Sequence, residues 1–190
     1  MSRFDDDLWE LVGEAGPPPR HLRAFVRGLP AVGDALDLGC GDGRLTTELR
    51  AERLTGADVS AVALARARAR LPDGGFVHLA PDEPLPFADT VFDLVLCAET
   101  LEHVRDVQLL LSEARRVLRP GGSLALTTPA HGRLTAVRAA VRGFEEVFDP
   151  LSPHLRFFTA RSLGRLLDQL GFDAPPPRRK SGTLLVSASR

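Results

Sequence analysis

Three glycines at alternate positions follow a short apolar run, and this stretch constrains the fold more than any other part of the sequence. Residues 35–38 suit a buried parallel strand, and the glycines that follow are Gly39, Gly41 and Gly43. Glycine accepts positive φ angles and has no Cβ, so a ligand can lie directly against the main chain. Leucines at helical spacing in residues 44–50 predict a helix whose first N–H groups point at the same ligand. The stretch therefore predicts a cofactor-binding turn.

Asp37 is the only charged residue within the predicted strand. A buried carboxylate costs several kcal/mol unless hydrogen-bond donors reach it. We therefore expect either the glycine turn or a bound ligand to supply donors to Asp37.

The spacing of the glycines differs from that of the dinucleotide-binding fingerprint, G-x-G-x-x-G. The third glycine comes one residue early, at Gly43, and Arg44 stands where the fingerprint requires glycine. This spacing disfavours a nicotinamide-dependent oxidoreductase, which remains the weaker alternative and would be revealed by NADH binding.

The composition is that of an ordinary globular protein, with 44% hydrophobic and 26% charged residues in 190. This length suits one domain, and a net charge of −1 offers no attraction to nucleic acid. Cys40 and Cys97 fall in predicted core or cofactor segments, so reduced thiols are expected. No apolar run approaches the ~20 residues of a membrane span, and the segment 4–7, Phe-Asp-Asp-Asp, is unlike a signal peptide. We expect a cytoplasmic protein without a membrane span.

The remaining elements are predicted from hydrophobic periodicity and turn residues. Further strands are expected over residues 53–59, 76–79, 91–98, 123–128 and 183–188, the last with a short or edge partner strand. Helices are expected over residues 4–12, 22–29, 61–71, 107–118, 134–141 and 160–170. Strands that alternate with helices predict an α/β fold with a doubly wound, mostly parallel sheet.

Asp58 lies at the end of the second predicted strand, directly before Val59 and the helix cap Ser60. In a doubly wound sheet a carboxylate at this place accepts both hydroxyls of a ribose, because a vicinal diol offers two donors. The alternative is a simple loop aspartate before a helix. Its position after the glycine turn favours ribose binding.

Two segments resemble a known family. Residues 36–46, an acidic strand residue followed by G-x-G-x-G, resemble the first motif of the class I S-adenosylmethionine-dependent methyltransferases. Residues 85–103, with Leu-Pro-Phe, Phe-Asp-Leu-Val and Leu-Glu-His, resemble the small-molecule branch called type 11, which includes quinone-biosynthesis enzymes. The resemblance implies a seven-stranded Rossmann-like methyltransferase sheet with an antiparallel last strand, N-terminal helices and a lid inserted after strand five.

The resemblance also implies the cofactor S-adenosylmethionine, with S-adenosylhomocysteine as product, and residues that bind it. These residues come from the glycine turn and the ends of the strands: Asp37, Gly39, Cys40, Gly41, Gly43, Asp58, Val59, Ser60, Asp82, Ala98, Glu99 and Thr100. Asp82 stands away from the family's usual acidic position for adenine, and a solvated loop carboxylate is an equal interpretation.

As a single domain, the chain divides into four parts by this resemblance. They are an N-terminal helical cover (1–33), a cofactor-binding core (34–128), a substrate lid (129–158) and a C-terminal helix and hairpin (159–190). Trp9 is expected either to cover the cofactor or to pack its own helix. Phenylalanines in the lid line an acceptor pocket or form the lid's own core, and residues 178–180 are expected to be a solvated turn.

The reaction implied is transfer of the sulfonium methyl group to an O, N or C atom of a small molecule. Since the cofactor is already activated, the protein mainly aligns the acceptor and excludes water. His103 and His154 are candidates for a general base, with structural hydrogen bonding as the alternative for each. No metal is expected, because no His, Asp or Glu cluster has ligand spacing. A catalytically idle cofactor-binding partner protein of the same fold remains the alternative function.

Overall fold

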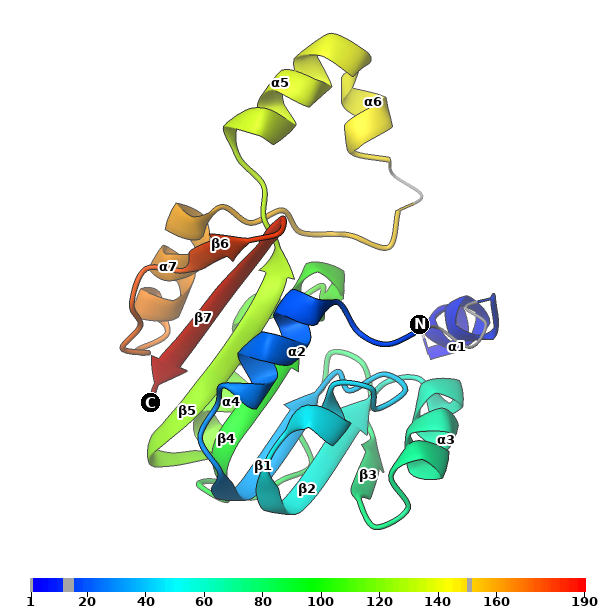
Figure 1. Cartoon of the computed structure of the whole chain (residues 1–190), viewed down its shortest axis with the longest axis vertical. Coiled ribbons are helices and arrows are strands. Elements are labelled where there is room, and N and C mark those ends of the chain that lie inside the picture. The colour runs from blue at the N-terminus through cyan, green and yellow to red at the C-terminus, as the bar shows by residue number, and fades with distance from the viewer. Residues whose placement is uncertain (1, 12–15, 150–151) are drawn as a thin grey trace.

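The structure is a computed structural model and describes residues 2–11, 16–149 and 152–190. Its centre is one seven-stranded sheet in the order β3-β2-β1-β4-β5-β7-β6 (Figure 1). The strands are β1 (Val32–Leu38), β2 (Ala51–Asp58), β3 (Gly75–His78), β4 (Phe92–Ala98), β5 (Leu118–Pro129), β6 (Arg178–Lys180) and β7 (Thr183–Ser189). Strand β7 runs antiparallel to β5 and to β6, and the other pairs are parallel. The predicted fold class is confirmed.

The helices of the described residues are α1 (Ser2–Leu11), α2 (Arg20–Arg27), α3 (Ala61–Arg70), α4 (Val107–Val117), α5 (Arg133–Arg142), α6 (Phe144–Val147) and α7 (Ala160–Gln169). Two short 3-10 turns, η1 (Thr46–Glu48) and η2 (Leu101–His103), follow β1 and β4. Helices α5 and α6 stand beyond the end of β5, away from the sheet (Figure 1). Val12, assigned by the sequence to the first helix, lies outside the described residues.

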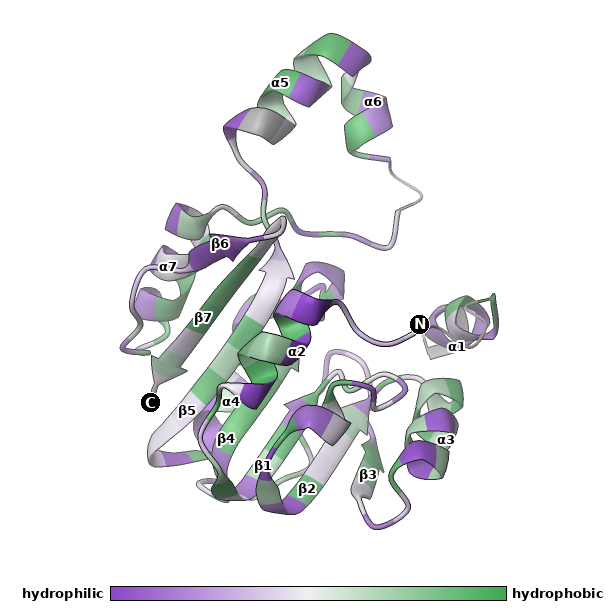
Figure 2. Ribbon diagram, viewed as in Figure 1, coloured by the Kyte–Doolittle hydropathy of each residue, from purple (hydrophilic) through white to green (hydrophobic). Residues whose placement is uncertain are grey.

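The sheet is covered on both faces. On one face, α4 and α7 bury leucines such as Leu111 and Leu163 against β5 and β7. On the other, α2 buries Val26 against Leu94 and Leu96 of β4. Each fully buried leucine contributes roughly 1.5–3 kcal/mol of transfer free energy. Figure 2 shows the result: hydrophobic colour follows the central strands, whereas edge strand β6 is hydrophilic.

The helix predicted over residues 44–50 is wrong, because only the three-residue turn η1 forms there. Pairing of Val32 with Ala51 requires the chain to return along the whole of β1 before β2 begins. That return covers about 20 Å, whereas seven helical residues would rise only about 10 Å. The connection therefore consists of turns and η1, followed by the extended residue Leu49, and Glu48 is fixed by ion pairs with Arg23 and Arg27 of α2.

Strand β5 and the segment before β7 also differ from the sequence prediction. Strand β5 begins at Leu118 because its pairing with β4 continues across the Pro-Gly-Gly segment, through a register shift opposite Phe92 and Leu94 of β4. The segment Arg178–Lys180 was expected to be a solvated turn but forms edge strand β6. Its side chains are exposed, and the prediction of a short edge partner for the last strand is confirmed.

Candidate functional site

The glycine turn lies at the carboxyl end of β1, beside the ends of β2 and β4. Gly39, Gly41 and Gly43 have φ angles of +77°, +53° and +78°, as their spacing predicted. A Cβ on Gly39 would lie 2.3 Å from Cγ2 of Thr100, and one on Gly41 would lie 2.7 Å from Cζ2 of Trp9. The turn therefore requires glycine both for its backbone angles and for its close neighbours.

Asp58 joins this turn to the start of α3. Its Oδ2 accepts a hydrogen bond from the Gly41 N–H at 2.8 Å, and its Oδ1 accepts one from the Ser60 N–H at 2.9 Å. Ser60 caps α3 by accepting from the Ala63 N–H, as predicted. The carbonyl oxygen of Val59 lies 2.9 Å from Nε2 of His78. Burial raises the pKa of the Asp58 carboxyl despite the two backbone donors.

Asp37 is satisfied by a side chain that the sequence analysis did not single out. Thr46 of η1 donates its hydroxyl to Asp37 Oδ2 at 2.6 Å, where donors from the glycine turn or a ligand were expected. Burial raises the pKa of Asp37 to about 7, and the charge of Asp58 adds to this shift.

This pKa predicts a pH-dependent stability. Below about pH 4, Asp37 is protonated in both the folded and the unfolded state. As the pH rises toward about 7, the unfolded state releases a proton that the folded state keeps, so the free energy of unfolding falls. The loss is on the order of 1.4 kcal/mol per unit of pKa difference. Urea unfolding of the cofactor-free protein and of Asp37→Asn should diverge over this range, and parallel curves would contradict the assignment.

Cys40 contributes its backbone to the turn, not its thiol. The N–H groups of Gly39 and Cys40 both donate to the Ala57 carbonyl oxygen, at 2.7 and 3.1 Å. The Cys40 thiol is buried next to Gly56 of β2, and burial raises its pKa.

Helix α1 lies against the start of α3 beside the glycine turn (Figure 1). Asp6 Oδ1 accepts from the Ser60 hydroxyl at 2.6 Å and from the Val62 N–H at 3.2 Å. Trp9 packs against Gly41, with the Arg66 guanidinium 5.9 Å from its ring centroid. Trp9 thus covers the turn and packs its own helix at once. Helix α2 instead packs on the sheet through Val26, so of the N-terminal helices in the described residues α1 is the one that contacts the glycine turn.

The end of β4 forms the other side of the site. Glu99 has a φ of +52°, and its N–H donates to the Thr127 carbonyl oxygen of β5 at 3.0 Å. The Thr127 hydroxyl donates in turn to Glu99 Oε1 at 2.8 Å. Burial raises the pKa of Glu99. The Thr100 hydroxyl donates to the carbonyl oxygen of Ala98 at 3.1 Å and faces the Gly39 carbonyl at 3.4 Å. The strand end is therefore locked to both neighbouring strands.

His103 and His154, both predicted candidates, lie together beside the buried Glu102. Their ring centroids are 4.9 Å apart, and His103 Nε2 is 3.9 Å from Glu102 Oε1. The Thr128 hydroxyl donates to Glu102 Oε2 at 3.0 Å. Burial raises the pKa of Glu102 to about 7. Glu102, Thr127 and Thr128 were not predicted as site residues, although paired threonines at a strand's carboxyl end are a readable signal.

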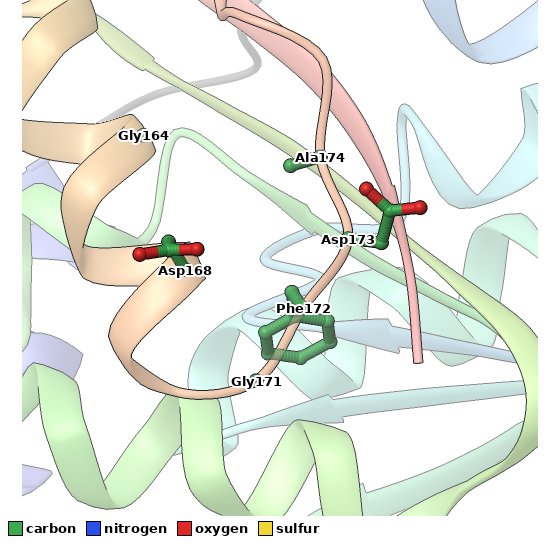
Figure 3. Close-up of a pocket in the computed structure, with 6 residues that line it drawn as sticks. All are labelled: Gly164, Asp168, Gly171, Phe172, Asp173 and Ala174. Carbon is green, nitrogen blue, oxygen red and sulfur yellow. The ribbon is translucent and has the colours of Figure 1, made fainter.

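Asp82, the displaced candidate for adenine, has a φ of +59° and forms an ion pair with Arg105. Its carboxylate is thus engaged by the loop that follows η2. A depression of about 310 Å³ lies elsewhere, between α7 and the segment toward β6 (Figure 3). Phe172, Asp168 and Asp173 line it, and none of them belongs to the glycine turn.

Three lid phenylalanines pack on one another. The ring centroids of Phe144 and Phe148 are 4.8 Å apart, those of Phe148 and Phe157 are 4.7 Å apart, and His131 lies 5.0 Å from Phe157. Phe158 is instead buried in the main core. The lid therefore has an aromatic cluster of its own, with Phe144 still 69% exposed.

Comparison with known proteins fits this geometry. A family model described as a methyltransferase domain matches residues 36–126. A ubiquinone biosynthesis O-methyltransferase of Aromatoleum aromaticum is 32% identical over 180 residues, spanning 87% of this chain and 76% of that protein. The chain belongs to the class I S-adenosylmethionine-dependent methyltransferases, in the type 11 branch.

Other members of the methyltransferase family resemble the chain to a similar degree. A probable S-adenosylmethionine-dependent methyltransferase of Mycolicibacterium smegmatis is 34% identical over 144 residues, which are 74% of this chain. The chain spans about half the length of that relative, 52%. A solved S-adenosylmethionine-dependent methyltransferase from Mesorhizobium loti is 26% identical, with a TM-score of 0.66 over 90% of this chain and 96% of that one.

The cofactor of this methyltransferase family is S-adenosylmethionine, and the residues at the turn fit it. The glycine turn and the carboxylate of Asp58 meet at the carboxyl ends of β1 and β2, where an open α/β sheet binds its ligand. Asp5 Oδ2 of α1 is buried, and no hydrogen-bond partner for it exists among the described residues. A cofactor with an ammonium group and a ribose diol supplies the donors that such a carboxylate lacks.

No helix in the described ranges has both the length and the apolar character needed to cross a bilayer.

Proposed function

We propose that the chain transfers the methyl group of S-adenosylmethionine to a small-molecule acceptor bound between the end of β4 and the lid. The observation that carries this proposal is the glycine turn, with three positive φ angles, bonded through Gly41 to the strand-end carboxylate Asp58. In open α/β sheets, ligands bind beyond the carboxyl ends of the strands, which is where these groups meet.

The proposed cofactor site uses the backbone of Gly39, Cys40, Gly41 and Gly43, with the carboxylate of Asp58 for the ribose. The site is lined by Val59, Ser60 and residues 98–100. Asp37 supports the turn through the hydrogen bond that it accepts from Thr46. Asp82 is retained for adenine only if its ion pair with Arg105 opens.

The acceptor site is proposed on the side of Glu99, Glu102 and the two histidines. Methyl transfer forms a bond from the acceptor atom to the methyl carbon and breaks the carbon–sulfur bond, leaving S-adenosylhomocysteine. An oxygen acceptor is favoured over nitrogen or carbon by the name of the Aromatoleum relative, an O-methyltransferase.

A cytoplasmic location is proposed as well, supported by two cysteines that are free thiols.

His103 is the proposed base or acceptor-positioning group. We expect His103→Ala to lower turnover more than about tenfold, since positioned general bases contribute at least that much. Cofactor affinity should change little, because the ring of His103 contacts Pro153 and His154 and not the glycine turn. Initial rates and calorimetric titration with S-adenosylhomocysteine measure the two effects.

The matched control is His21→Ala, whose ring lies 3.1 Å from the Thr183 hydroxyl at the start of β7, two strands away from β4. Equal turnover for His103→Ala and His21→Ala would remove His103 from the mechanism. Binding of S-adenosylmethionine without methylation of any hydroxylated, amine or carboxylate acceptor would favour the alternative, a catalytically idle partner protein.

A further inference from the structure

We propose that Glu102, His103 and His154 bind a divalent transition-metal ion on the acceptor side of the site. One ligand atom from each residue, a carboxylate oxygen or a ring nitrogen, lies within 4.8 Å of the other two. The ion site stands on this geometry alone, whereas its role toward the acceptor rests on the proposed methyl transfer. No metal was expected from the sequence, because His154 reaches the cluster from the lid and lies far from Glu102 along the chain.

The hydrogen bonds around the cluster leave its inner atoms free to ligate. His103 Nδ1 lies 3.0 Å from the Pro153 carbonyl oxygen, which can only accept, so Nδ1 carries the proton. Nε2 therefore presents a lone pair toward Glu102. Glu102 Oε2 accepts from the Thr128 hydroxyl, which leaves Oε1 on the side of His103. Metal-binding histidines and carboxylates are held by outer partners in this way.

The segment that carries His154 is anchored to the same residue. The N–H groups of Leu155 and Arg156 donate to the Glu102 carbonyl oxygen at 2.7 and 3.1 Å. The His154 N–H donates to the Ser152 hydroxyl at 3.2 Å. The lid histidine is therefore fixed beside η2 by main-chain bonds and does not depend on the position of α5 or α6.

Two imidazoles and one carboxylate select the kind of ion. This donor set suits Zn²⁺, Mn²⁺, Fe²⁺ or Co²⁺, whereas Mg²⁺ prefers oxygen ligands. Ligand bonds of about 2.0–2.2 Å place ligand atoms about 3.0–3.5 Å apart, so the side chains must close by about 1 Å on binding. Three protein ligands also leave coordination positions open.

An open position beside the cofactor suits an acceptor with a hydroxyl group. Binding to the ion lowers the pKa of the hydroxyl, and its proton passes to solvent and not to His103, whose Nε2 ligates the ion and whose role is then to position the acceptor. The resulting oxyanion attacks the methyl carbon, the carbon–sulfur bond breaks, and the sulfonium becomes the thioether of S-adenosylhomocysteine. The balance requires no oxidant or reductant.

The test is titration of tag-free, chelator-treated protein with Zn²⁺ by calorimetry, repeated with Co²⁺ while its visible absorption is recorded. We expect one ion per chain and a d–d spectrum of bound Co²⁺. His154→Ala and Glu102→Gln should each weaken affinity at least about tenfold, the lower bound for losing even an outer partner. His21→Ala, outside the cluster, should bind as the wild type does, and Mg²⁺ should not compete.

Two results would overturn the site: no saturable binding below millimolar Zn²⁺, or equal binding by the wild type and His154→Ala. S-adenosylhomocysteine affinity is measured on the same samples. Loss of ion binding with cofactor binding retained would refute the metal site and leave the proposed function standing. The opposite pattern would refute the proposed function and leave the ion site.

Discussion

A Gly39→Ala variant is expected to lose about a hundredfold or more in affinity for S-adenosylmethionine. At a φ of +77°, any residue with a Cβ is strained by about 1–2 kcal/mol. The new Cβ would also stand 2.3 Å from Cγ2 of Thr100, a distance at which one of the two segments must move. Overpacking of this kind costs about 1–3 kcal/mol, and each 1.4 kcal/mol taken from binding is about tenfold in affinity.

Gly121→Ala provides a matched control. Gly121 has nearly the same φ, +78°, but nothing lies within 4 Å of a Cβ placed there. The Gly121→Ala variant should be less stable because of the backbone strain, and it should bind the cofactor as the wild type does. Calorimetric titration and urea unfolding of both variants separate the two effects. Equal affinities would mean that the approach of Thr100 to the turn is unimportant for binding.

An Asp58→Ala variant should raise the dissociation constant of S-adenosylmethionine about a hundredfold. The change removes the acceptor for the Gly41 and Ser60 N–H groups and the carboxylate proposed for the ribose. Hydrogen bonds to a charged group contribute about 1.5–3 kcal/mol each. Stability should fall by less than affinity does, because removing a buried carboxylate also relieves the desolvation that raises its pKa.

The control for Asp58→Ala is Asp168→Ala, an exposed carboxylate on α7 at the depression of Figure 3. Both variants are titrated with S-adenosylhomocysteine and with NADH, and NADH should bind neither of them. If Asp58→Ala binds S-adenosylhomocysteine as tightly as Asp168→Ala does, the ribose assignment is wrong.

Local sequence patterns predicted most of the sheet because they act through neighbouring residues. The apolar runs before Gly39 and over β4 have the length and the flanking residues of buried strands, and Ser60 could be recognised as a helix cap from its own surroundings. The helix over residues 44–50 failed because its leucines have helical spacing, while the length of the return path along β1 is a property of the sheet.

The features of the candidate site fall into the same two groups, those set by local sequence and those set by contacts between distant elements. The sequence by itself determined the three positive φ positions of the glycine turn and the strand-end carboxylate, since glycine spacing and strand ends are local features. Only the tertiary structure placed Thr46 as the hydrogen-bond donor to Asp37 and brought His154 beside Glu102 and His103. Those contacts join residues on different elements, and their partners are chosen by strand order and by main-chain bonds between η2 and the lid, which no local pattern encodes.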